Sequence, residues 1–150
     1  MNNLEILKLI HVLGAIVWVG GAVLMIILGF RVAKADLGRR LGYTEDMNFV
    51  GGRVFAPASI VTLSAGIWLV IWHPAYDFNQ LWIILALGGI AVSIAIGMGF
   101  YPPQGNALIA ELKAGNPAAE ARSARIARVS MVDTAILLIV VWAMVAKPGL

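Results

Sequence analysis

Residues 9–30 read LIHVLGAIVWVGGAVLMIILGF, without a single Asp, Glu, Lys or Arg. Because a helix rises about 1.5 Å per residue, this stretch is long enough to cross the roughly 30 Å hydrocarbon core of a bilayer. A secretory signal has a shorter apolar stretch and a small-residue cleavage site. Here a basic cluster follows instead, made up of Arg31, Lys34, Arg39 and Arg40. The stretch therefore predicts an uncleaved first transmembrane helix.

Three further apolar stretches occupy residues 54–72, 81–101 and 129–146. Of the 150 residues, 61% are hydrophobic and 13% are charged, whereas soluble domains are about 25% charged. A soluble protein of this size could not bury so much apolar surface. We therefore expect a single all-α integral membrane domain, folded as an up-down-up-down four-helix bundle. The predicted spans cover residues 6–30, 50–73, 80–101 and 122–146.

Prolines and one asparagine suggest where helices bend, stop and start. Pro57 lies near the start of the second span and predicts a kink. Pro102 and Pro103 are expected to end the third span. Residues 106–113 then form a short amphipathic surface helix, and Asn116 is a candidate N-cap, so that the fourth helix begins well before the membrane.

Lysine and arginine are unevenly distributed over the connections. Five lie between spans one and two and four between spans three and four, whereas residues 73–80 carry none. The positive-inside rule then places both termini on the non-cytoplasmic side, where Trp72, Tyr76 and Trp82 would form an aromatic belt. The net charge of +3 comes without a long basic tract, which favours an anionic lipid surface over nucleic acid as the partner.

Glycines recur in the predicted spans and would let helices approach closely. They are Gly14, Gly20, Gly21, Gly66, Gly88, Gly89, Gly97 and Gly99.

Two ionisable residues are expected at similar depth near the cytoplasmic side. Arg53 enters the second span there, and Asp133 lies about one turn inside the fourth. An ionisable group inside a bilayer is costly and usually has a partner. We expect a structural ion pair between Arg53 and Asp133. A proton relay is the alternative, although few polar side chains would continue it across the membrane.

His11 is the candidate ligand of a cofactor. It shares one helix face with Lys8, Ala15 and Trp18, because steps of three and four residues return to the same face. An imidazole beside small residues and a large aromatic suits haem b, whose iron takes a histidine ligand. Lys8 could pair with a propionate, and His73 is a conceivable second ligand. The alternative is that His11 hydrogen-bonds a neighbouring helix and that His73 is an interfacial residue.

Other metal chemistry finds less support in the sequence. The chain has no cysteine and two histidines, which excludes thiolate catalysis and makes a poor zinc site. Thioethers suit copper(I), but the methionines are scattered and more typical of core packing. Those considered are Met25, Met98, Met131 and Met144.

The first span resembles the opening helix of a bacterial membrane superfamily that includes CopD-type copper-resistance proteins and HemJ-type protoporphyrinogen IX oxidases. The order of Lys8, His11, Trp18 and Gly21 is similar to the HemJ pattern, which implies that His11 is a haem ligand. Later parts of the chain also resemble this superfamily, namely Arg53 with Pro57, Gly66 with Trp68, and Trp82. The closing group of Met144, Lys147 and Pro148 resembles an uncharacterised integral-membrane branch.

The sequence departs from the HemJ pattern at two places. Tyr101 is followed by Pro102 where HemJ enzymes have a tyrosine-histidine pair, and Asp133 is the only acidic residue near their asparagine-glutamate pair. We assign no catalytic residue and do not expect porphyrinogen oxidation. The leading hypothesis is a haem-b-binding protein of the bacterial cytoplasmic membrane with a redox or porphyrin-related role. Alternatives are a cofactor-free accessory subunit of a larger membrane complex or homo-oligomer, and copper handling.

Overall fold

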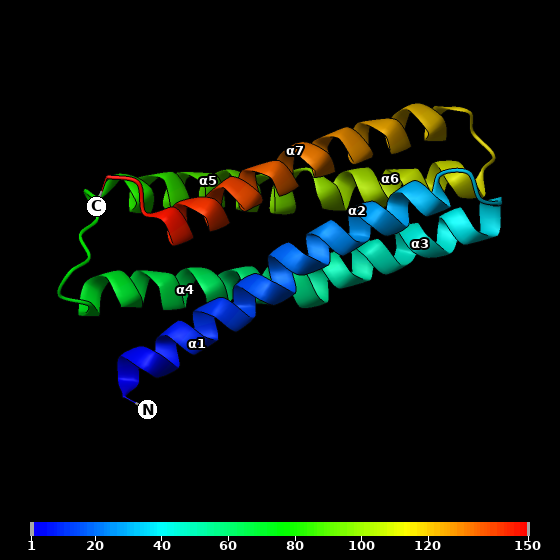
Figure 1. Ribbon diagram of the computed structural model, residues 1–150. Coiled ribbons are helices and arrows are strands. Elements are labelled where there is room, and N and C mark those ends of the chain that lie inside the picture. The colour runs from blue at the N-terminus through cyan, green and yellow to red at the C-terminus, as the bar shows by residue number, and fades with distance from the viewer. Residues whose placement is uncertain (1, 150) are drawn as a thin grey trace.

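The computed structural model describes residues 2–149 and consists of four long helices that lie side by side, with no strand in that range (Figure 1). The first helix runs through α1 (Asn3–Ala15), η1 (Ile16–Gly20) and α2 (Gly21–Val32). The second runs through α3 (Leu37–Val50), η2 (Gly51–Phe55) and α4 (Ala56–Trp72). The third comprises α5 (Leu81–Gly99) and α6 (Tyr101–Lys113), and the fourth is α7 (Ala118–Ala146). The prediction of an all-α chain is confirmed.

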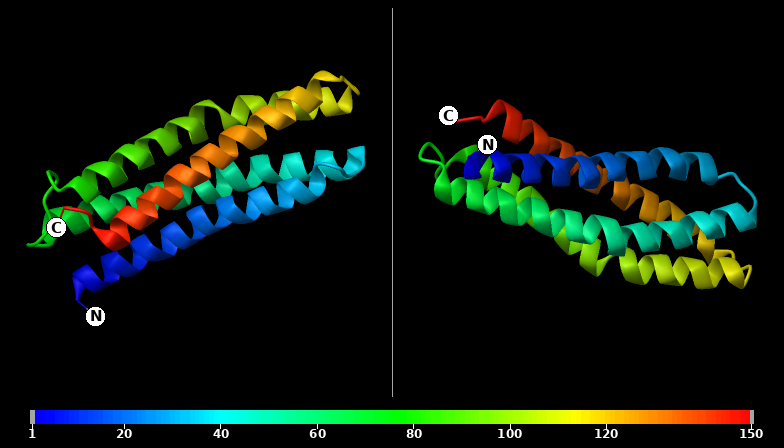
Figure 2. Two further views of the ribbon diagram at one scale, coloured as in Figure 1. Left: turned by 45° about the horizontal axis from the view of Figure 1, so that its top comes forward. Right: turned by 90° about the horizontal axis from the view of Figure 1, so that it is seen from below.

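The two ends of the bundle are distinguished by their connections (Figures 1 and 2). The end that holds both chain termini and residues 73–80 is called the terminal end. The opposite end holds residues 33–36 and 114–117 and is called the loop end.

Three of the four long helices begin close to a polar side chain that accepts a backbone hydrogen bond, whereas α5 begins at Leu81 without one. Asn2 and Glu5 form a reciprocal capping box at the start of α1, and Asp36 accepts from the Arg39 N–H at the start of α3. Asn116 Oδ1 accepts from the Ala118 N–H at 2.9 Å. The fourth helix begins at Ala118, so its expected start well before the membrane is confirmed, but its N-cap is Pro117 and not Asn116.

Two local predictions at the loop end are wrong. Residues 37–50 form α3 instead of a connection, because Asp36 caps them. The helix expected at 106–113 begins at Tyr101, with Pro102 and Pro103 in its first turn. Prolines are tolerated there because first-turn N–H groups have no helical partner. The third helix is interrupted at Phe100 and continues as α6. The two prolines therefore do not end it, and α5 with α6 remains long enough to span a membrane.

A π-helical turn precedes Pro57, where a kink was expected. Pro57 has no N–H for the carbonyl of Arg53, four residues before it. The preceding segment η2 is π-helical, and the Ala56 N–H donates to the Gly51 carbonyl, five residues back. Insertion of this wider turn accommodates the proline while the helix continues.

Close helix contacts occur at half of the predicted glycines. A Cβ at Gly14 would lie 2.3 Å from Thr62 Oγ1, and one at Gly89 would lie 2.5 Å from Val140 Cγ2. Gly21 meets Phe55 and Gly66 meets His11 in the same way. The prediction is wrong at four positions, where nothing lies within 4 Å: Gly20, Gly88, Gly97 and Gly99. The helices accordingly pair as α1 with α4 and α5 with α7.

Most apolar side chains face outward. Only 11–28% of each helix's most apolar window is buried inside the chain, so the outer surface needs apolar surroundings. The four helices have 30, 36, 33 and 29 residues, or about 44–54 Å of length. All four are long and apolar enough to cross a membrane, and they exceed the roughly 30 Å hydrocarbon core.

Candidate ligand-binding cavity

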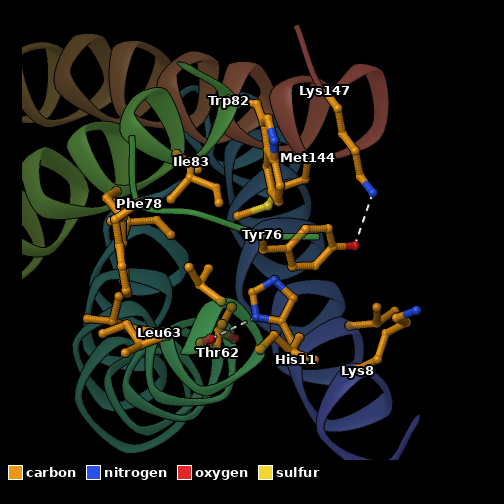
Figure 3. A pocket seen from close by; sticks show the side chains of 18 of the residues that line it. Lys8, His11, Thr62, Leu63, Tyr76, Phe78, Trp82, Ile83, Met144 and Lys147 are labelled. Atoms are coloured by element: carbon orange, nitrogen blue, oxygen red, sulfur yellow. Dashed lines mark hydrogen bonds between the residues drawn. The ribbon is translucent and has the colours of Figure 1, made fainter. Parts of the chain in front are cut away.

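A cavity of about 350 Å³ lies at the terminal end of the bundle, between the α1–α4 pair and the α5–α7 pair (Figure 3). Ligand pockets in proteins begin near 300 Å³. The walls are mainly apolar and include Leu63, Ile67, Ile83, Ala86 and Ile90. The space exists because α4 and α5, joined by residues 73–80, make few contacts with each other.

His11 projects from α1 into this cavity (Figure 3). Its Nδ1 lies 2.8 Å from the carbonyl oxygen of Thr62 on α4. A carbonyl oxygen only accepts, so Nδ1 carries the proton and donates. The neutral ring then has its lone pair on Nε2, which can accept a hydrogen bond or bind a metal. The other ring nitrogen faces away from Thr62 (Figure 3).

Gly66 makes this position of the imidazole possible. A Cβ there would lie 2.9 Å from His11 Cε1 and 3.1 Å from Nδ1. Since a side chain at this position would collide with the ring, the missing Cβ lets the imidazole lie against α4 and reach the Thr62 carbonyl. Residues from the second helix therefore determine how His11 is held.

Two lysines line the cavity. Lys8 lies one turn before His11, and its exposed side chain extends away from the interior (Figure 3). Lys147 donates from Nζ to the Tyr76 hydroxyl at 3.1 Å. The same ammonium group lies 4.9 Å from the Tyr76 ring centroid and 5.4 Å from that of Trp82, within the range of cation–π attraction. These contacts keep a positive charge at the edge of an apolar space.

Trp82 also lines the cavity. The residue is 4% exposed, and its indole Nε1 is buried without a hydrogen-bond partner among the described residues. Buried N–H groups are normally satisfied. The indole N–H of Trp82 is enclosed by the protein and is not itself exposed to the cavity.

The other two residues expected to bind a cofactor lie outside the cavity lining. Trp18 is buried in a core cluster with Ala86 and Ile90, which themselves line the cavity. His73 follows α4, and its ring stacks on Tyr76 with centroids 4.0 Å apart. Trp18 therefore supports the wall, and His73 supports the tyrosine that holds Lys147.

Tyr76, Lys147, Met144 and Thr62 line the cavity although they were not expected to. Tyr76 and Trp82 were assigned to a lipid-facing belt, but both turn inward, whereas Trp72 is 50% exposed. Their clustering near the end of a span was the available signal. Of the methionines considered for copper, Met144 alone lines the cavity, and Met98 is 75% exposed.

The expected ion pair between Arg53 and Asp133 does not form. Asp133 Oδ2 accepts instead from the Tyr101 hydroxyl at 3.1 Å, and Arg53 is exposed on η2. The physical reason is helix placement, because η2 packs against α3, α4 and η1, whereas Asp133 lies on α7. Similar depth along two helices did not make them neighbours.

Comparison of the chain with protein-family models, with curated proteins and with solved structures gives no match. What the cavity binds must therefore be inferred from its own residues.

Proposed function

We propose that this chain is a small multi-pass membrane protein that binds haem b in the terminal-end cavity, with His11 Nε2 as the ligand to iron. The observation that supports this most is the hydrogen bond from His11 Nδ1 to the Thr62 carbonyl. Metal-binding histidines almost always donate their other N–H to a carbonyl, carboxylate or water, which fixes the tautomer and orients the ring. A histidine that is only a packing residue does not need its free nitrogen directed into a cavity.

The remaining lining fits an amphiphilic ligand with an anionic end. The apolar walls suit a porphyrin face, and the Lys8 and Lys147 ammonium groups suit its carboxylates. Bound haem would supply one-electron redox chemistry at this end of the bundle. The similarity of the first span to HemJ-type sequences supports the same assignment.

In this proposal the chain crosses a bacterial cytoplasmic membrane four times. The loop end, with its arginines, faces the cytoplasm, and the cavity lies toward the opposite face. The outward-facing apolar surface supports a lipid environment, and the distribution of lysine and arginine supports the orientation.

The test is an absorption spectrum of protein purified in detergent from haem-replete cells. We expect a Soret band that His11→Gly abolishes and that added imidazole restores, because free imidazole can occupy the space of the missing ring. His73→Ala is the matched control and should retain the band. Colourless wild-type protein, or a band that His11→Gly leaves unchanged, would overturn the proposal.

A further inference from the structure

A second polar site lies deeper in the bundle, where α5, α6 and α7 meet. Asp133 on α7 is 8% exposed, and Ser93 on α5 is 2% exposed. The Tyr101 hydroxyl, on the first residue of α6, donates to Asp133 Oδ2 at 3.1 Å. These side chains form a small polar group where the three helices meet.

Two oxygen atoms of this group lack partners. Asp133 Oδ1 and Ser93 Oγ are both buried, and neither has a hydrogen-bond partner among the described residues. The two side chains nevertheless lie close enough to interact. Buried polar atoms without a partner are rare and costly. A single proton on Oδ1 would satisfy both atoms, because the acid O–H could then donate to Ser93 Oγ.

No cation among the described residues is placed to balance an ionised carboxylate. Of the elements packed against α7, η1 and α5 carry no ionisable residue, and α2 carries only Arg31 in its last turn. On α6, Glu111 and Lys113 lie at the far end and pair with Arg122 and Glu45.

The basic residues of α7 itself are engaged elsewhere. Arg125 lies over the Phe100 ring at 5.5 Å, Arg128 Nε donates to the Ala124 carbonyl, and Arg122 binds Glu111. An ionised Asp133 would have the Tyr101 hydroxyl as its only hydrogen-bond partner. Most of the free-energy cost of removing its charge from water would then not be offset.

We infer that Asp133 is a reversible proton-binding site, protonated at neutral pH, whose acid O–H donates to Ser93 while its other oxygen accepts from Tyr101. The site is separate from the cavity, whose lining includes none of these three residues. It gives the bundle a group that takes up or releases one proton inside the apolar region, and release requires water or a cation to reach α7.

Infrared spectroscopy of the detergent-purified protein tests this inference. At neutral pH we expect the carbonyl band of one protonated carboxylic acid per chain, which Asp133→Asn removes. Asp46→Asn is the matched control, because Asp46 is an exposed carboxylate at the loop end; this variant should keep the band. Identical spectra from wild-type protein and Asp133→Asn would overturn the inference.

A measurement on unaltered protein covers the case in which Asp133→Asn does not fold. Dicyclohexylcarbodiimide is an apolar reagent that adds to protonated carboxylic acids: the acid proton moves to a carbodiimide nitrogen, the carboxyl oxygen bonds the central carbon, and nothing leaves. Mass spectrometry should locate one adduct on Asp133 at neutral pH, with less at alkaline pH. Full recovery of the Asp133 peptide without adduct would show an ionised carboxylate and refute the site.

Discussion

The loop end and the terminal end of the same four helices are held together by different means. At the loop end, Arg122 donates from Nε and Nη2 to the two Glu111 oxygens at 2.8 and 2.7 Å and from Nη1 to Gln104. Further links join Arg40 to Glu120 and Asn48 to Asn106. At the terminal end, His11 binds Thr62 within one helix pair and Lys147 binds the Tyr76 hydroxyl, but a cavity separates the two helix pairs.

This difference means that the loop end stabilises the bundle, whereas the terminal end contains the cavity. The loop-end helices are tied by charge-assisted, partly bidentate bonds, which are the stronger kind, and by a small core of Leu108, Leu112 and Ala119. The bundle therefore does not need contact between its two helix pairs at the terminal end. That end is left with space for a ligand, and the side chains that line it are free to serve binding.

After the loss of His11 itself, the largest effect should come from Gly66→Ala at the terminal end. The added Cβ would lie 2.9 Å from His11 Cε1, so the ring must move and its bond to Thr62 is lost. Loss of such an orienting bond typically lowers metal affinity about 10- to 100-fold. Titration of haem into apo-protein in detergent measures the change in Kd.

Gly88→Ala is the control for this variant, because nothing lies within 4 Å of that position. It should bind haem as the wild type does. A Gly66→Ala protein with unchanged affinity would mean that the Thr62 carbonyl does not orient the ligand.

An intermediate effect is expected at the loop end, where the property that changes is thermal stability and not haem affinity. Arg122→Met removes both bonds to Glu111 and the bond to Gln104, and we expect the thermal midpoint in detergent to fall by several degrees. The haem spectrum should stay unchanged, because the terminal end is untouched. Lys113→Met, which breaks an ion pair between side chains 57% and 48% exposed, should change the midpoint very little.

The pH dependence of this variant sharpens the comparison. The hydrogen bond from Arg122 holds the pKa of Glu111, which lies beyond the apolar part of its helix, below the ordinary value of 4.5. A carboxyl with a lowered folded-state pKa stabilises the fold above its unfolded pKa, and that contribution is lost as pH falls through the folded value. The gap in midpoint between wild type and Arg122→Met should therefore be full at neutral pH and shrink below about pH 4.5. A constant gap would contradict the role of the ion pair.

The same contrast explains what the sequence could predict. Four apolar runs were readable because each is continuous in sequence. The helix α3 was missed because its sequence is polar and its apolar contacts are supplied by α6, far along the chain. A capping residue, Asp36, was the local signal that it existed.

Local sequence predicted less of the candidate site than of the fold. The helical repeat placed His11 and Lys8 together because both lie on one helix. Thr62 and Gly66, which hold the imidazole, are about fifty residues away, and only tertiary packing brings them there. The wrong partner for Asp133 has the same origin, since depth in the membrane could be read from sequence but the neighbouring helix could not.

The smallest effect should come from Lys147→Ala at the cavity edge. Lys147 is half-buried, so its attraction to a ligand carboxylate is partly screened by solvent, and such pairs contribute about 0.2–1 kcal/mol. We expect haem affinity to fall about two- to fivefold and the deficit to shrink at high salt, because screening weakens exposed pairs. Lys34→Ala, at the loop end, has no contact with the cavity and should bind normally. If Lys147→Ala abolished binding while His11→Gly did not, the terminal end would hold its ligand by charge and not by the imidazole, and the assignment of haem would give way to an anionic amphiphile.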